Sequence, residues 1–504
     1  MRRSSSILVL TIALSSIMFS LFQNCAPYSS SSVKTPLGSL GINPTPAPTS
    51  TPGQTPSIIF QPKSVVRGEQ NAAVVIALTN VRQTYTLNWQ ITPAGTDFTP
   101  SSGSLIINSG ATEATLRFNS TAAAGTGNKT FMLQVTEASS SKFTYSNQIN
   151  VVDNTPPPMI SAGMYSTCWV KNMVVQCWGD NSKGTLGTGD TTSHNVPVNV
   201  DVTGITAAFT QVSVGDYSTC GVAGGALFCW GDNPVGQLGD GTVAAKLKPV
   251  ANATLRTGVQ QVSVGSVHAC AIVNGGVYCW GRNNHGQLGT GNTDNKLIPT
   301  AVPGLNSGVT AISAGYYFTC AIHNGAAKCW GWGANGQLGT GTGNNDAVSP
   351  QSVANAASGV TSIAAGGYHA CAVIAGYIKC WGSNTFGELG DGTQISRNYP
   401  SALLNNPSGA TQVTAGKNHT CGIFSGAALC WGFNTHYNVG DGTLTHRKSP
   451  GQVQTLISEV IGISAGQQSE HTCGIKNNEF VCWGLGTSGQ RGNGTNKTGN
   501  PGST

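Results

Sequence analysis

Charged residues are scarce in this chain of 504 residues. Only 9% of them are Asp, Glu, Lys or Arg, against roughly a quarter in ordinary soluble domains. The formal net charge is +6, and so small a surplus over so long a chain gives no electrostatic reason to expect a nucleic-acid partner. A surface made of neutral Ser, Thr, Asn and Gly is more typical of an exported protein than of a cytosolic enzyme.

A long apolar run is also lacking, apart from ILVLTIALSSIMFSLF at 7–22, which is short for a membrane span. It follows a short basic start and precedes Cys25 in FQNCA, an arrangement that predicts an export signal. Residues 1–25 resemble a bacterial lipoprotein signal peptide, although Gln23 and Asn24 stand where that family prefers small residues. The resemblance implies that Cys25 is lipidated and anchors an outer-membrane lipoprotein facing the periplasm or the cell surface. Ordinary secretion is the alternative.

The next two segments contain no cysteine after Cys25. Residues 26–56 are rich in Pro, Ser and Thr and have almost no bulky apolar side chain, so they cannot bury a core and are predicted to be a tether. Residues 57–153 contain short runs of alternating β-branched and aromatic residues separated by turn residues. This pattern predicts an immunoglobulin-like β-sandwich with Trp89 in its core, acting as a spacer.

Helical periodicity is missing from residues 156–504, where a repeat takes its place. Each copy reads V-x-A-G-x-x-x-T-C, a short hairpin, C-W-G-x-N, G-Q-L-G-x-G and a P-x-x-V strand. A unit of about 50 residues made of short strands cannot bury its faces alone, whereas units arranged radially bury them against one another. The fold class is therefore predicted to be all-β, with an immunoglobulin-like β-sandwich followed by a seven-bladed β-propeller.

The cysteines are predicted to form one disulfide in each repeat. In CAIVNGGVYC the pair Asn274-Gly275 suits a two-residue type I′ turn. Counting outward from that turn places Cys270 opposite Cys279 in a non-hydrogen-bonded pair, where Cα atoms approach to about 4.5 Å. The fifteen cysteines then make seven pairs and leave Cys25 for lipid. The expected bonds are Cys168–Cys177, Cys220–Cys229, Cys270–Cys279, Cys320–Cys329, Cys371–Cys380, Cys421–Cys430 and Cys473–Cys482.

These motifs carry a resemblance. A-G-x-x-H-T-C-A-I-x-N-G followed by W-G-x-N-x-x-G-Q-L-G-x-G is similar to the repeat of the regulator of chromosome condensation family, in a superfamily with the type II β-lactamase inhibitory protein. The resemblance covers residues 156–504 and implies a seven-bladed propeller. YNVGDG at 437–442, GQRGNG at 489–494 and the ending NPGST depart from the repeat. Residues 156–162 are therefore a candidate for a missing edge strand.

No chemistry of catalysis or metal binding stands out in the repeats. Their glycine-rich element is neither a Walker loop nor followed by a helix, so it is interpreted as a turn. The tryptophan of each C-W-G is interpreted as packing between blades. Four histidines that precede a first cysteine are interpreted as structural, and they are His268, His369, His419 and His471. Other repeats have Ser166, Ser218 or Phe318 at this position. We expect no catalytic residue, no metal and no cofactor.

Two loop positions change freely between repeats and are the candidates for recognition. One follows the V-x-A-G element, and the other follows each Trp-Gly pair. Loops on a rigid scaffold carry function, and Tyr, Trp and Arg are typical interface anchors. The predicted partner-binding residues are Tyr217, Arg282, Tyr316, Tyr317, Trp332, Tyr368 and Phe433. Ordinary loop decoration is the competing interpretation.

The leading hypothesis is a non-enzymatic, envelope-anchored protein-binding scaffold whose membrane contact is the lipid alone. An activity like that of the family namesake, guanine-nucleotide exchange, is a second hypothesis, although export would separate the protein from a cytosolic GTPase. A propeller-based carbohydrate-active enzyme is a third, for which the sequence offers no acid and base pair. A β-lactamase inhibitor would be a special case of the first hypothesis.

Overall fold

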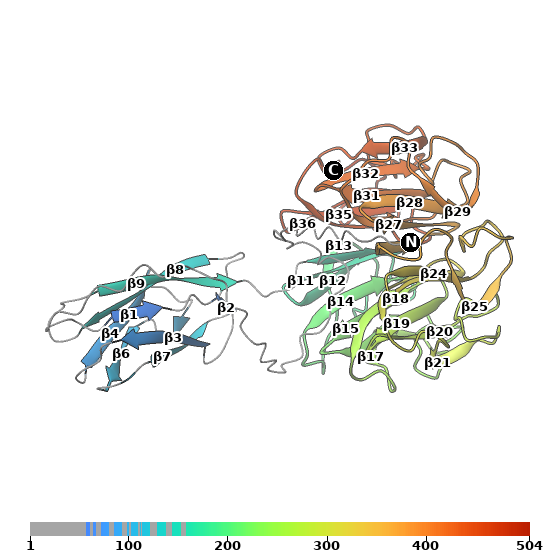
Figure 1. Cartoon of the computed structure of the whole chain (residues 1–504). Helices are drawn as coiled ribbons and strands as arrows, with labels where there is room; N and C mark the ends of the chain where they lie inside the picture. Colours follow the sequence, from blue (N-terminus) through green and yellow to red (C-terminus); the bar gives the residue numbers. More distant parts are fainter. Residues whose placement is uncertain are drawn as a thin grey trace, which may run out of the picture. The chain divides into compact units, whose positions relative to one another are not determined.

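The computed structural model describes residues 158–503 throughout. Before them it describes Asn108, Ala111 and the nine strands between Ser57 and Val152. The chain divides into two compact units on either side of the bond between Pro156 and Pro157 (Figure 1). Cys25 and the predicted tether 26–56 lie outside the described residues. Among the described residues, no helix has the length and apolar character needed to cross a membrane.

The N-terminal unit contains two sheets. One has the strand order β1-β3-β7-β5 and the other β2-β9-β8-β4-β6. β2 pairs with β9 in parallel, and the other pairs are antiparallel. The strands are β1 (Ser57–Phe60), β2 (Ser64–Val66), β3 (Ala72–Thr79), β4 (Tyr85–Thr92), β5 (Phe98–Thr99), β6 (Ser102–Ile107), β7 (Glu113–Ser120), β8 (Lys129–Glu137) and β9 (Thr144–Val152).

Alternation along β4 builds the core of this unit. Leu87, Trp89 and Ile91 are buried, whereas the residues between them are exposed. Leu133 on the neighbouring strand β8 and Leu116 on β7 of the other sheet are also buried. The period of two is what a strand with one buried face requires. The prediction that Trp89 belongs to the core is confirmed, because its side chain is 6% exposed.

Residues 159–484 form seven antiparallel sheets, called here sheets one to seven in chain order. The first strands are β10 (Met159–Ala162), β14 (Phe209–Val214), β18 (Val259–Val264), β22 (Val309–Ala314), β26 (Val360–Ala365), β30 (Ala410–Ala415) and β34 (Val460–Ser464). The second strands are β11 (Ser166–Lys171), β15 (Ser218–Ala223), β19 (His268–Val273), β23 (Phe318–His323), β27 (His369–Ile374), β31 (His419–Phe424) and β35 (His471–Lys476).

The third strands are β12 (Val174–Gly179), β16 (Ala226–Gly231), β20 (Gly276–Gly281), β24 (Ala326–Gly331), β28 (Tyr377–Gly382), β32 (Ala427–Gly432) and β36 (Glu479–Gly484). The fourth strands are β13 (His194–Asn199), β17 (Lys246–Ala251), β21 (Lys296–Ala301), β25 (Ala347–Ser352), β29 (Arg397–Ala402) and β33 (Arg447–Gln452). Each fourth strand contains a proline, and proline at a sheet edge hinders pairing with another chain. This arrangement, with sheets that follow one another in a ring, is a β-propeller (Figure 1).

The second and third strands of every sheet form the predicted cysteine hairpin. Asn274 and Gly275 at one tip both have positive φ, as a type I′ turn requires. The register places Cys270 opposite Cys279, as counted from the sequence. All seven predicted disulfides are present, with Cα atoms 4.0–4.1 Å apart. Seven disulfides indicate an oxidising environment, which agrees with export.

The glycine after each first strand allows neighbouring sheets to touch at the centre of the ring. A Cβ atom at Gly265 would lie 2.6 Å from the carbonyl oxygen of Gly315 in the next sheet. A carbonyl oxygen of the next sheet is similarly close at five other positions, and the last of these closes the ring, because a Cβ at Gly466 of sheet seven would collide with Ala162 of sheet one. At Gly416 a Cβ would instead collide with the His419 ring. Only glycine permits this approach. We call these residues the ring glycines, and they are Gly163, Gly215, Gly265, Gly315, Gly366, Gly416 and Gly466.

The repeated tryptophans lock each sheet to the one before it. Trp280 is fully buried, and its indole N–H donates to the carbonyl oxygen of Gln237 in the glycine-rich loop of sheet two, at 2.9 Å. The same bond, 2.8–3.0 Å long, recurs at all seven tryptophans. The packing role predicted for the tryptophans is confirmed, and the glycine-rich element is the turn that presents the accepting carbonyl group.

Sheet seven closes on sheet one by the same contacts. Trp178 donates to the carbonyl oxygen of Gln490 at 2.9 Å, and the backbone N–H of Ala162 donates to Ser464 Oγ at 3.0 Å. The expectation that residues 156–162 supply a missing edge strand is wrong, because β10 is the first strand of sheet one and pairs with β11. Its four residues complete the centre of the ring, where every other sheet also needs a first strand.

The departure at GQRGNG has a structural reason in sheet seven. Arg491 stands where five other repeats have a buried leucine, and it is itself 2% exposed. Its guanidinium donates to the carbonyl oxygens of Lys497 at 2.9 Å and of Ser503 at 2.6 Å. Within the described residues this sheet has three strands. Arg491 therefore fastens the segment that follows Gly499, which bridges Gly484 where a fourth strand begins in the other sheets.

Candidate interaction surface

The two variable loop positions lie together at one end of every sheet. In sheet four the N–H of Trp332 donates to the carbonyl oxygen of Tyr317 at 2.9 Å, and equivalent bonds join the two loops in the other sheets. In five of the seven sheets the backbone N–H after the ring glycine also donates to the next sheet, as Tyr316 N–H does to the Gly366 carbonyl oxygen at 3.2 Å. We call the surface formed by these two positions around the ring the axial face.

Four of the predicted partner-binding residues form one aromatic cluster on the axial face. The ring centroids of Tyr316 and Tyr317 are 4.0 Å apart, and Tyr368 of sheet five lies 5.9 Å from Tyr316. Trp332 contacts Tyr368 at 5.8 Å and Tyr317 at 6.3 Å. All four side chains are half-buried. We call Tyr316, Tyr317, Trp332 and Tyr368 the aromatic cluster.

Arg282 and His285 of sheet three border the aromatic cluster. The Arg282 guanidinium lies over the Tyr317 ring at 5.7 Å, so this predicted residue joins the cluster by a cation–π contact. The His285 ring lies 5.3 Å from Tyr317 and 5.8 Å from Trp332, and its Nδ1 is 2.7 Å from a carboxylate oxygen of Asp346. Sequence reasoning missed His285. It occupies a third position that varies between repeats, two residues before the Gln of the glycine-rich loop.

Tyr217 and Phe433, the two other predicted residues, lie apart from the aromatic cluster. Tyr217 packs against Tyr165 of sheet one at 5.6 Å. Phe433 contacts Phe386 at 5.0 Å and stacks on His446 at 5.1 Å. The axial face therefore carries three separate aromatic groups. Their separation follows from the ring, which spreads equivalent loop positions around its centre.

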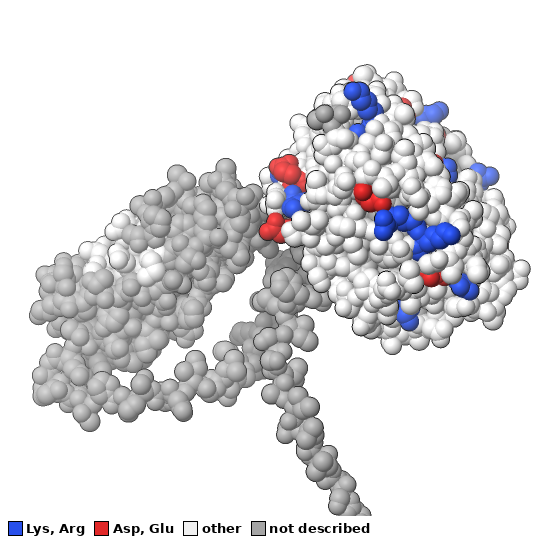
Figure 2. All heavy atoms as spheres, turned by 90° about the horizontal axis from the view of Figure 1, so that it is seen from above, with Lys and Arg blue, Asp and Glu red and all other residues white. Residues whose placement is uncertain are grey.

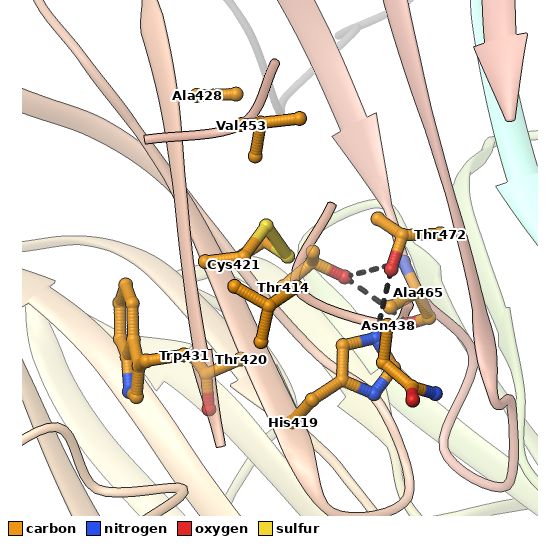
Figure 3. Close-up of a disulfide and its surroundings, with 12 residues drawn as sticks. Thr414, His419, Thr420, Cys421, Ala428, Trp431, Asn438, Val453, Ala465 and Thr472 are labelled. Carbon is orange, nitrogen blue, oxygen red and sulfur yellow. Dashed lines mark hydrogen bonds between the residues drawn. A yellow bond between two sulfur atoms is a disulfide. The ribbon is translucent and has the colours of Figure 1, made fainter. Parts of the chain in front are cut away.

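The side chains next to the ring glycines are structural. His369 is fully buried, and its Nε2 lies 2.8 Å from Thr420 Oγ1 of the next sheet. Thr420 Oγ1 already donates to the Glu388 carbonyl oxygen at 2.7 Å, so the histidine must donate through Nε2. Burial lowers the pKa of His369 to about 3, and the ring is neutral. Figure 3 shows the equivalent pair of His419 and Thr472, 2.7 Å apart, beside the Cys421 disulfide.

In sheets one and two, different side chains fill the space beside the ring glycine. Sheet two has Ser218 in place of the histidine, and the next sheet there has Val264, whose methyl group packs against the ring glycine. Where the histidine or Phe318 is present, the next sheet has alanine. The partner residue changes too, because Phe318 packs with Ala370 where a histidine meets threonine. Variation at this position is therefore compensated across the interface between sheets, as close packing requires.

One loop of the axial face crosses the centre of the ring. The loop of sheet seven has two residues more between its ring glycine and first cysteine than that of sheet six. Gln467 in this loop donates from Nε2 to the Val264 carbonyl oxygen of sheet three at 3.1 Å. Glu470 of the same loop pairs with Lys417 at 3.1 Å and with His436 at 2.9 Å. The longer loop therefore joins sheets three, six and seven at the axial face.

Asp216 of sheet two lies next to this centre and is 8% exposed. Its Oδ2 accepts a hydrogen bond from the Ser266 hydroxyl, and its Oδ1 has no partner. Burial raises the pKa of Asp216 to about 6, against the opposing effects of Ser266 and Lys417. Within residues 158–503 no group of three or more His, Cys, Asp and Glu side chains could hold a metal ion.

The repeats match a known family. The family described as Regulator of chromosome condensation (RCC1) repeat matches residues 175–222, 224–272, 274–322, 324–373, 376–423 and 425–475. A second description of the same repeat matches residues 259–287. Each match begins near a hairpin tip, so it spans the outer part of one sheet and the inner part of the next. Six matches within seven sheets follow from this offset, since the remaining unit is divided between the first and last sheets.

One solved structure is similar in fold and is matched over most of its length. The crystal structure of human WBSCR16 is 22% identical, covers 65% of this chain and 92% of that chain, and superposes with a TM-score of 0.57. At this identity the likeness concerns the fold alone. The crystal structure of Kluyvelomyces marxianus Hsv2 is 6% identical, covers 55% of this chain and 77% of that chain, and has a TM-score of 0.32, too low to bear on the fold. No curated protein matches the chain.

Proposed function

The chain belongs to the regulator of chromosome condensation repeat family, and from that premise we propose that it is a non-enzymatic protein-binding scaffold. In this proposal residues 156–504 form a closed seven-bladed propeller whose axial face binds a protein partner. Residues 57–153 form an immunoglobulin-like spacer, and lipidated Cys25 anchors the protein to the outer membrane. The observation that carries the binding role is the aromatic cluster, in which side chains from two sheets and an arginine from a third make one surface.

The fold does not require aromatic residues at the positions of the aromatic cluster. The equivalents of Trp332 in neighbouring sheets are Arg282 and Ser383, so the fold accommodates three different side chains at this position. Half-buried tyrosine and tryptophan rings held by their neighbours lose little conformational freedom when a partner covers them. The hydrogen bond from Tyr317, together with burial, raises the pKa of Tyr316 far above its ordinary value, so the Tyr316 hydroxyl group stays neutral.

The scaffold role is supported by the structural bonds that the reactive side chains of the propeller form. The fourteen cysteines of the propeller are all in disulfides. The buried Glu388 accepts hydrogen bonds from the backbone N–H of Phe386 at 2.7 Å and from the Ser383 hydroxyl at 3.1 Å, the position that glutamine fills in other repeats. Such groups hold loops in shape, which agrees with a protein that binds and does not catalyse.

The test uses the full chain made with its disulfides, as wild type and as Tyr316→Ala and Trp332→Ala. A partner captured by the wild type from envelope extracts is purified, and its affinity for each variant is measured. Loss of a central aromatic anchor costs about 2 kcal/mol, which is roughly thirtyfold in affinity. Thermal unfolding should change little, because each side chain lies in a loop.

Asn324→Ala is the matched control. Asn324 has positive φ at a hairpin tip, so its replacement weakens the turn and leaves the axial face intact. It should lower the melting temperature slightly and bind the partner normally. Normal binding by both Tyr316→Ala and Trp332→Ala would move the interface away from the aromatic cluster. A fall of many degrees in both melting temperatures would make these residues part of the core instead.

The anchor has its own test. Mass spectrometry of the mature protein should find an N-terminal lipidated Cys25, and the protein should partition into detergent. The low charge of the propeller agrees with an exported protein, since Figure 2 shows a face of mostly uncharged atoms with Lys and Arg in small groups. If the mature protein instead begins at another residue and carries no lipid, the anchor is wrong and the protein is secreted.

A further inference from the structure

Sheets one and two present three carboxylates on the axial face that form no ion pair. Asp180 and Asp232 follow the Trp-Gly pairs of the two sheets and are half-buried, and Asp216 follows a ring glycine. Among the ion pairs of residues 158–503, none includes any of the three. Most other aspartates of the propeller are paired with a lysine, an arginine or a histidine.

Two tyrosines lie among these carboxylates. Tyr165 and Tyr217 are 5.6 Å apart, and their carbonyl oxygens accept the N–H groups of Asp180 and Asp232 at 2.9 and 2.8 Å. Burial, the neighbouring Tyr165 and the nearby charges of Asp216 and Asp180 raise the pKa of Tyr217 to about 12. We call Tyr165, Asp180, Asp216, Tyr217 and Asp232 the acidic patch.

Asp216 supplies an independent sign that the acidic patch is incomplete. It is more than nine-tenths buried, yet its Oδ1 has no hydrogen-bond partner. Asp216 directly precedes Tyr217 in the chain, and its charge contributes to the raised pKa of both Tyr217 and Tyr316. Lys417 is the nearest cation, but it pairs with Glu470. A buried carboxylate oxygen without a partner is costly, and a positive charge nearby would lower that cost.

We propose that the acidic patch binds a lysine or arginine side chain of the protein partner, between the tyrosine rings and the carboxylates. This inference rests on the proposed function, because it adds a cationic contact to the same axial face. The chain offers a comparison in sheets three and four, where Arg282 covers Tyr317 and Asp346 pairs with His285. There the chain's own cations contact a tyrosine ring and a carboxylate. In sheets one and two, by contrast, Asp180 accepts hydrogen bonds from the hydroxyl groups of Ser182 and Ser193, and Tyr217 contacts Tyr165.

The direct test uses two acetylated, amidated peptides, hexa-arginine and hexa-glutamate, with the full chain at physiological ionic strength. Calorimetry should detect the arginine peptide and not the glutamate peptide. The double variant Asp180→Asn/Asp232→Asn should weaken binding of the arginine peptide by about tenfold or more, since charge–charge and cation–π contacts are both lost. Tyr217→Phe should retain binding because the ring remains, and Tyr217→Ala should lose it.

Glu459→Gln/Glu479→Gln is the matched control, because it changes the net charge equally at two exposed residues beside hairpin tips, at the end of the sheets opposite the axial face. It should bind the arginine peptide as the wild type does. Equal weakening by the control and the patch variant would overturn the proposal, because attraction would then follow net charge alone. Equal binding of the two peptides by the wild type would overturn it as well.

Partner binding separates this inference from the proposed function. If Trp332→Ala loses the captured partner while Asp180→Asn/Asp232→Asn keeps it with unchanged affinity, the partner uses the aromatic cluster and the cationic contact is wrong. If both variants keep the partner, the axial face is not the interface. Weakened partner binding by both variants, with wild-type melting temperatures, is the result expected here.

Discussion

Sheets one and two differ from sheets three to seven beside the ring glycines. The first two use a serine with a valine from the next sheet, and the others use a histidine or phenylalanine with an alanine. Both combinations fill the space beside the ring glycine, so the difference between the two groups of sheets is a difference in packing. On the axial face, by contrast, Arg282, Trp332 and Ser383 occupy the same loop position in successive sheets and are half-buried. Compensated variation at buried positions marks the core, and variation at half-buried loop positions marks the surface available for recognition.

The largest effect should come from acid, which acts on the sheets that contain histidine. Burial lowers the pKa of His268, His369 and His471 to about 3 and that of His419 to about 4. The unfolded chain binds protons below the ordinary pKa of 6.5, and the folded chain does not, so stability is full above pH 6.5 and falls as the pH decreases. At pH 5 the loss is about 2 kcal/mol for each histidine. Urea unfolding at a series of pH values measures it.

Two features of the chain sharpen this prediction. The raised pKa of Asp216 has the opposite sign and offsets about 1 kcal/mol at pH 5, because the folded state then binds a proton that the unfolded state does not. The variant His369→Phe/Thr420→Ala copies the natural pair of Phe318 and Ala370. It should unfold with a smaller pH dependence than the wild type. An unchanged pH dependence would show that the buried histidines do not control acid stability.

Replacing the serine–valine packing of sheet two by the histidine of other sheets should lower the free energy of unfolding by less than acid does. Ser218→His places an imidazole where Val264 packs against the ring glycine, and overpacking of this kind costs roughly 1–3 kcal/mol. Adding Val264→Ala should recover part of the loss, and adding Ala269→Thr should supply the missing acceptor. A double-mutant cycle by urea unfolding measures the coupling. Additive effects of Ser218→His and Val264→Ala on the free energy of unfolding would contradict the idea that these two positions compensate each other.

Removal of a hairpin disulfide should cost the same in both groups of sheets. Cys168→Ala/Cys177→Ala in sheet one and Cys270→Ala/Cys279→Ala in sheet three each open a ten-residue loop, worth roughly 2–3 kcal/mol in the chain-entropy model. The hairpin does not involve the residues beside the ring glycines, so denaturant midpoints should fall equally. A much larger loss in one sheet would tie the disulfide to the packing at the centre.

The smallest effect on stability should come from the axial face. Trp332→Ser introduces the residue that sheet five has at this position, and it should lower the free energy of unfolding by less than about 1 kcal/mol. Calorimetric melting measures this, and Trp330→Ala is the contrasting variant, because it removes a fully buried ring and its hydrogen bond to Gln287. If Trp332→Ser were as damaging as Trp330→Ala, the distinction between core and axial face would fail.

Much of the propeller could be predicted from the sequence because its repeats are built from local interactions. The Asn274-Gly275 turn fixes the hairpin register within ten residues, and the register places Cys270 opposite Cys279. Seven copies of that hairpin then exclude most other folds. The structural role of the tryptophans followed from the same repetition, since a residue present in every repeat belongs to the scaffold.

Contacts between sheets were harder to predict. The cluster of Tyr316, Trp332 and Tyr368 needs the angle between sheets, which no single repeat contains. His285 was missed because only two variable positions were compared. The place of β10 in sheet one was assigned wrongly, since a four-residue strand has little pattern of its own and its position depends on the ring glycines of its neighbours.

The sequence by itself determined the strands, the turns and the seven disulfides, because each is decided within one hairpin by backbone geometry and residue spacing. Only the tertiary structure decided how the hairpins meet. Ring closure, the exchange of Ser218 and Val264 for histidine and alanine, and the loop of Gln467 that crosses to Val264 all join residues about 50 or more positions apart. Such contacts depend on the packing of whole sheets, and packing is set by the shapes of many side chains at once.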